Sequence, residues 1–202
     1  MKKLLIAMLM LLPMAVAAQD NTWEQPEKSE KGNPDQKYLA GAVPVVDGRV
    51  TFQTTIKAPG KSKAQIYAIM LEQMQKMTKE ENQLEQSRVL TTDEENKSKI
   101  VANYQEWLVF KNKPLSLDRT RMFFHLMADI KDGEAKLIMT RIYYLYDEER
   151  NATTYQAEEW ITDRWGLNKK QNKLARVSGK FRRKTIDRKD YIFKKFETLL
   201  NQ

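Results

Sequence analysis

Two strands and the turn between them are encoded by DRTRMFFHLMADIKDGEAKLIMTRIYYLYD, residues 118–147, and this stretch decides the fold. Every second residue of its first half is apolar, which places on one face Met122, Phe124, Leu126, Ala128 and Ile130. Because strand side chains alternate between faces, this period of two indicates a strand with one face in a core. Asp132-Gly133 is typical of a hairpin turn, and a second apolar strand follows it.

Three more strands are predicted upstream. Residues 86–92 and 97–110 have strand character and flank a polar turn, DEEN, so that with the two strands above they form a four-stranded antiparallel meander. An earlier strand is indicated by alternating residues, namely Val50, Phe52, Thr54 and Ile56. Pro59 and Gly60 end this strand.

Two helices complete the pattern. Ser62 and Gln65 form a capping box that predicts a helix start, and the helix carries an apolar stripe of Tyr67, Met70, Leu71, Met74 and Met77. Core packing is favoured for this stripe over an adaptable binding surface. Asp187 is predicted to cap a terminal helix, whose apolar face consists of Ile192, Phe193, Phe196, Leu199 and Leu200. The sequence therefore predicts an α+β fold, an antiparallel sheet with both helices packed on one face.

The N-terminal residues predict export. Residues 1–18 combine Lys2 and Lys3, a short apolar run and small residues ending at Ala18, which is typical of a cleavable signal peptide. We expect a flexible linker over 19–41, a single domain over 42–202, and no transmembrane segment in the mature chain. The chain contains no cysteine, which excludes disulfides, thiolate metal sites and a lipoprotein anchor. The expected location is periplasmic or secreted.

Positive charge is concentrated at the C-terminal end. The whole chain carries +8, and residues 164–202 alone contain 13 lysine and arginine residues against 3 acidic ones. A candidate site for an anionic surface consists of Lys180, Arg182, Arg183, Lys184, Arg188 and Lys189, with residues 180–185 interpreted as a last strand. A solvated basic surface is the alternative. Gly166 and NKKQNK, residues 168–173, indicate an exposed loop. Expected partners are an envelope protein or an anionic glycan or lipid surface, and not nucleic acid.

Residues with catalytic potential are few. His125 is the one histidine and lies within a predicted strand, which favours a structural role, and no catalytic, metal or cofactor site is predicted. A carbohydrate hydrolase needs two carboxyl groups across a cleft, and Glu158, Glu159 and Asp163 lie near Trp160 and Trp165. Because no motif sets their geometry, this activity remains an alternative.

Four stretches carry a resemblance to a known family: YLAGAVPVVDGRVTF (38–52), PGKSKAQIY (59–67), AEEWITDRWGLNKK (157–170) and GKFRRKTIDRKDYIF (179–193). Together they resemble secreted bacterial domains of unknown function with a TATA-binding-protein-like fold, from about residue 38 to residue 200. The resemblance implies a β-α-β4-α order but no catalytic or binding residues, and the name of the fold does not imply DNA binding.

The function predicted from these observations is a non-enzymatic binding or interaction module of the bacterial cell envelope. Two alternatives stay open. One is the hydrolase near Trp160. The other is a carrier of an apolar small molecule between the sheet and the C-terminal helix, whereas a filled core there would favour interaction with a protein.

Overall fold

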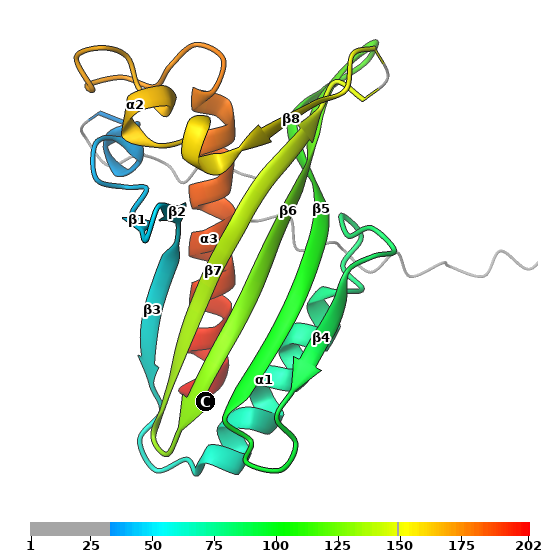
Figure 1. Ribbon diagram of the computed structural model, residues 1–202, viewed down its shortest axis with the longest axis vertical. Coiled ribbons are helices and arrows are strands. Elements are labelled where there is room, and N and C mark those ends of the chain that lie inside the picture. The colour runs from blue at the N-terminus through cyan, green and yellow to red at the C-terminus, as the bar shows by residue number, and fades with distance from the viewer. Residues whose placement is uncertain (1–32, 149) are drawn as a thin grey trace, which may run out of the picture.

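A long antiparallel sheet is the frame of the molecule. The computed structural model describes residues 33–148 and 150–202. The strands run in the order β3-β7-β6-β5-β4, and β8 pairs with β7 (Figure 1). Their bounds are β3 Phe52–Lys57, β4 Arg88–Thr92, β5 Lys99–Lys113, β6 Ser116–Lys131, β7 Glu134–Tyr146 and β8 Thr153–Gln156. All pairings are antiparallel, which confirms the meander and the strand before it.

Two helices, α1 (Lys63–Met77) and α3 (Gly179–Leu200), lie behind the sheet as Figure 1 is viewed. The core forms between these layers, and the predicted inner face of β6, from Met122 to Ile130, is buried in it. From α3, the buried apolar side chains are Phe181, Ile186, Ile192, Phe196 and Leu200. The sheet-helix interface is thus filled with protein side chains, an arrangement that gives no support to the apolar carrier.

The start of α1 is held as predicted. The Ser62 hydroxyl accepts a hydrogen bond from the Gln65 amide, and the Gln65 side chain accepts one from the Ser62 amide at 2.8 Å. A carboxylate oxygen of Asp132, in the β6–β7 turn, accepts from the Lys63 amide at 2.7 Å. The predicted apolar stripe is buried in the core except for Leu71, which is partly buried. The hairpin turn and the helix start therefore stabilise each other.

The last helix begins earlier than the sequence predicted. α3 spans 22 residues from Gly179, so the strand predicted over 180–185 and the cap predicted at Asp187 are both wrong. The physical reason lies in the buried face of α3, which includes Arg182, Thr185 and Arg188. These polar side chains interrupt the apolar period that identifies an amphipathic helix.

The N-terminal boundary also differs. The predicted signal peptide and most of the predicted linker lie outside the described residues, but a 3-10 helix, Gln36–Tyr38, packs on the domain. Tyr38 is 5% exposed, and its hydroxyl donates to the Asp187 carboxylate at 2.8 Å. Burial and this hydrogen bond raise the pKa of Tyr38 to about 12. The linker predicted to end at residue 41 therefore extends too far, because its last residues belong to the folded unit.

A buried ion pair joins α3 to β5 of the sheet. The Arg188 guanidinium donates to both carboxylate oxygens of Glu106 at 2.9 Å, and the two side chains are 1% and 0% exposed. The same guanidinium donates to Glu80, in the segment after α1, at 2.7 Å. Loss of one partner from such a cluster leaves an uncompensated buried charge, which destabilises a fold strongly.

We predict that Arg188→Met lowers the free energy of unfolding by about 3–5 kcal/mol, because Glu106 would keep a buried charge without its cation. Urea unfolding measures the change, with an unaltered m-value as the sign of two-state behaviour. Lys194→Ala is the control: its pair with Glu197 has side chains 75% and 55% exposed, and little change is expected. Equal destabilisation by both variants would contradict the role of the buried pair.

Candidate functional site

The six cations predicted to bind an anionic surface all lie on α3, and two of them are inside the protein. The Arg182 and Arg188 side chains are 0% and 1% exposed, so the prediction is wrong for both. Their guanidinium groups are surrounded by acceptors of the fold. Neither side chain reaches the surface, and neither is available to a partner.

The other four cations are partly neutralised within the protein. Lys180 donates to Asp118 at 2.7 Å, Arg183 pairs with Asp35, and Lys189 pairs with its neighbour Asp190. Lys184 is half-buried and also has an interaction partner. The basic face predicted for this run is therefore largely a set of internal ion pairs.

Arg182 instead holds together three segments that are far apart in the chain. Its guanidinium donates to the backbone carbonyls of Tyr38, Leu39 and Ile161 at 2.6, 2.6 and 2.7 Å. It also donates to the Asp163 carboxylate at 2.7 Å. The other oxygen of Asp163 accepts from the Gly41 amide at 2.8 Å. Arg182 thus attaches the N-terminal segment and α2 (Asp163–Gly166) to α3.

Close packing at this point positions the connection between α2 and α3. Gly166 lies against Arg182, where a β-carbon would come within 2.8 Å of the arginine side chain and of the Ile161 carbonyl oxygen. A side chain at this position would displace one of the two, so glycine is required. The Ser178 hydroxyl donates to the Trp165 carbonyl at 2.5 Å and closes the connection at its other end. We call residues 164–177, the end of α2 and the connection that follows it, the basic loop.

The basic loop is ordered by its own hydrogen bonds. The Asn168 side-chain oxygen accepts from the backbone amides of Asn172 and Lys173, at 3.1 and 3.3 Å. The backbone amide of Asn168 donates to the Lys173 carbonyl at 2.9 Å, and Leu167 bridges to Leu174. Such side-chain-to-backbone bonds are typical of tight turns that contain asparagine. The loop therefore presents its side chains in a defined arrangement.

The cations of the basic loop face solvent. No aspartate or glutamate occurs in residues 164–177, and five exposed cations do: Arg164, Lys169, Lys170, Lys173 and Arg176. Between the described side chains, the ion pairs involve none of these five. The sequence predicted an exposed loop here, but the predicted binding cations lie on α3. The sequence does contain a feature that distinguishes the basic loop from α3: the loop has no acidic residue, whereas α3 has three.

Apolar side chains accompany these cations. Trp165 is 46% exposed and Val177 54% exposed, and the Arg164 guanidinium lies 4.9 Å from the Trp165 ring centre. Tryptophan beside arginine combines an apolar surface with a polar edge, a combination enriched where proteins meet the interfacial region of membranes. The basic loop therefore has the side chains expected to bind a surface that is anionic outside and apolar beneath.

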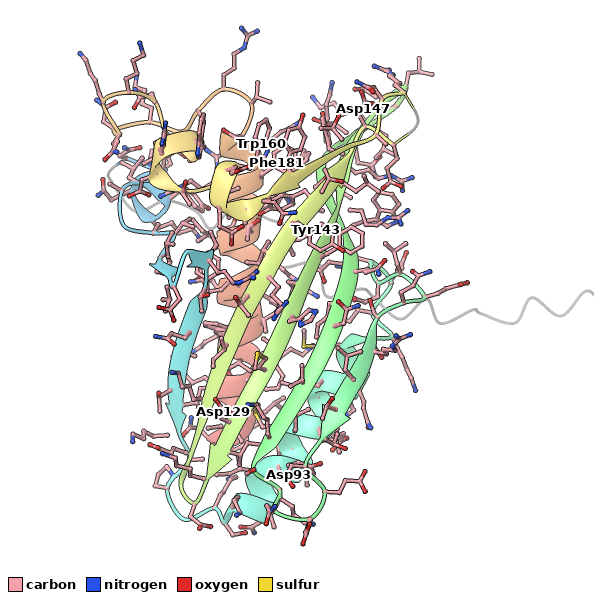
Figure 2. All side chains as sticks on the ribbon, viewed as in Figure 1. Asp93, Asp129, Tyr143, Asp147, Trp160 and Phe181 are labelled. Atoms are coloured by element: carbon pink, nitrogen blue, oxygen red, sulfur yellow. The ribbon has the colours of Figure 1, made fainter. Side chains whose placement is uncertain are left out.

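Of the three carboxylates near Trp160, Glu158 and Asp163 have structural roles, and Glu159 is exposed. Glu158 accepts from the Val50 amide at 2.7 Å, and both oxygens of Asp163 are engaged as described above. Trp160 stacks on Tyr155, with ring centres 3.8 Å apart, and lies beside Phe181 where β8 meets α3 (Figure 2). These contacts hold the fold together and do not arrange two carboxyl groups across a cleft, as a hydrolase would need.

A cavity of about 280 Å³ lies elsewhere, beside Trp107 at the ends of β5, β6 and β7. Of its carboxylates, Asp118 accepts from Lys180 at 2.7 Å and Glu148 from Arg121 at 2.8 Å.

The described residues contain no group of three or more histidine, aspartate or glutamate residues able to hold a metal ion. In the same part of the chain, no helix has the length and apolar character needed to cross a membrane.

Comparison with known proteins identifies the fold family. Residues 52–145 match the model of a family described as a domain of unknown function, DUF4468, with a TBP-like fold. A DUF4468 family protein from Bacteroides ovatus, of known crystal structure, is 38% identical, with 85% of this chain and 97% of that chain covered and a TM-score of 0.77. A TBP-like protein from Parabacteroides distasonis is 15% identical, with 78% and 96% covered and a TM-score of 0.59, a likeness of fold alone. No curated protein matches the chain.

His125 lies on the face of the sheet that points away from the helices, and its cross-strand partner is Thr140 of β7. Partial burial lowers its pKa below the ordinary value near 6.5, and the nearby charge of Arg141 lowers it further. The folded state therefore favours the neutral imidazole. The resulting stability is fully present above the unfolded-state pKa and is lost as pH falls from there through the folded-state pKa.

We predict that the natural chain loses stability relative to His125→Gln as pH falls from about 7.5 to about 5. The unfolding free energy of the natural chain minus that of the variant should therefore decrease over this range. Urea unfolding of both chains at each pH measures it and removes the contribution of carboxylates, which both share. The single imidazole allows an NMR titration as an independent check. A folded-state pKa at or above the ordinary value would contradict this account.

Proposed function

The chain belongs to the DUF4468 family, and we propose that it is a non-enzymatic interaction module of the bacterial cell envelope, held at an anionic membrane surface by the basic loop. The family description assigns no activity, so the proposal rests on the site. Export through the predicted signal peptide would bring the protein to envelope membranes.

The observation that carries the proposal is a set of five exposed cations on an ordered loop without acidic residues. Each basic residue close to an anionic lipid surface contributes about 1 kcal/mol to binding. The cations of α3 contribute less, because most of them are buried or paired with a carboxylate of the fold. Attraction of this kind is reversible and weakens as salt shortens the Debye length.

A lipid surface fits the loop better than a soluble acidic glycan does. Trp165 and Val177 are exposed beside the cations, and apolar groups gain little from a hydrated polysaccharide. At a bilayer the same side chains enter the interfacial region while the cations stay at the headgroups.

We expect substitution of Lys169, Lys170 and Lys173 by glutamine to weaken binding to vesicles of phosphatidylcholine and phosphatidylglycerol by roughly a hundredfold, from about 1 kcal/mol per lysine. Co-sedimentation at low and high salt measures the affinity. The triple variant of Lys97, Lys131 and Lys136, exposed near the opposite end of the sheet, is the control because it loses the same charge.

Equal loss in the two triple variants would show that net charge, and not the basic loop, governs binding. Failure of the natural chain to bind anionic vesicles at low salt would overturn the proposal. Stronger binding to a soluble acidic polysaccharide than to vesicles would replace the membrane with a glycan as the partner.

A further inference from the structure

A second exposed apolar and basic segment lies at the same end of the molecule as the basic loop. This segment is KNKPLSL, residues 111–117, which comprises the end of β5, the turn and the start of β6, and we call it the β5–β6 turn (Figure 1). Leu115 is 109% exposed relative to a reference residue, and Leu117 is 54% exposed. Lys111 and Lys113 are exposed too, and the segment contains no acidic residue. The two leucines are therefore flanked by positive charge.

The turn itself gives no reason for an apolar residue at its tip. Leu115 has a φ of 63°, a left-handed conformation that glycine and asparagine adopt more readily than leucine. Its side chain is fully in water, so it adds nothing to the core. A branched apolar side chain thus occupies a position where backbone geometry and solvation both favour a small or polar residue. Burial against an external apolar phase would offset this cost.

Charges near the turn permit close approach to an anionic surface. Asp118, directly after the turn, is paired with Lys180 and also accepts from the Tyr146 hydroxyl. Asp147, in the neighbouring β7–β8 turn, is exposed at this end of the molecule (Figure 2), and Arg150 of the same turn is exposed with it. The charges of residues 111–117 themselves are all positive, and the acidic residue that follows them is paired within the fold.

We propose that the β5–β6 turn inserts Leu115 and Leu117 into an anionic phospholipid bilayer while the basic loop contacts the headgroups. This inference rests on the proposed function and adds a second attachment point to it. Full burial of a leucine increases partitioning into an apolar phase roughly tenfold to a hundredfold. The two leucines therefore add a hydrophobic contribution to membrane affinity that cations alone do not provide. Durable membrane attachment generally combines two such signals, one apolar and one basic.

The absence of cysteine allows a direct test, because Leu115→Cys creates a unique labelling site. An environment-sensitive fluorophore at this position should shift to the blue with vesicles of phosphatidylcholine and phosphatidylglycerol, and should be quenched by spin-labelled lipid. Leu90→Cys is the control, because Leu90 is 43% exposed on the edge strand β4, away from this end. The probe at Leu90 should show neither effect.

Affinity gives an independent readout. Leu115→Ser combined with Leu117→Ser should weaken vesicle binding at least tenfold at unchanged charge, whereas Leu90→Ser should leave it unaltered. Normal vesicle binding by the serine variant, with an unshifted probe at position 115, would overturn insertion and leave the electrostatic attachment standing. Absence of vesicle binding by the natural chain would instead overturn the attachment itself, and insertion with it.

Discussion

A buried guanidinium group must find acceptors for its donors, and this constraint governs how α3 sits in the protein. Arg182 and Arg188 both lie on the inner side of the helix. Arg188 finds carboxylates from the sheet and from the segment after α1, and Arg182 finds three backbone carbonyls and Asp163. An unpaired charge at either place would cost several kcal/mol, so these acceptors determine where the neighbouring segments lie.

The same constraint explains why the richest run of positive charge is not the most available one. On α3, most cations are buried or face carboxylates within hydrogen-bond distance, which partly neutralises their charge. In the basic loop, asparagine side chains and tight turns satisfy the backbone, and the lysines have no acidic neighbours. The number of charged residues in a stretch of sequence is therefore a poor measure of the exposed, unpaired charge that a binding partner would encounter.

The family match and the proposed attachment surfaces overlap only in part. Residues 52–145 comprise most of the sheet and α1, together with the β5–β6 turn, whereas the basic loop lies beyond the matched region. A shared frame with function placed in loops is common among folds of this kind.

Alternation of apolar residues in β6 and the Asp132-Gly133 turn determined the sheet from sequence alone, since a period of two survives wherever one face is buried. The α1 cap followed from Ser62 and Gln65 for the same local reason. The start of α3 could not be predicted in this way, because its buried face contains the polar residues Arg182, Thr185 and Arg188, which interrupt the apolar period. Whether an arginine is buried and paired or exposed depends on acceptors up to 144 residues away in the chain, and only the tertiary structure brings these together.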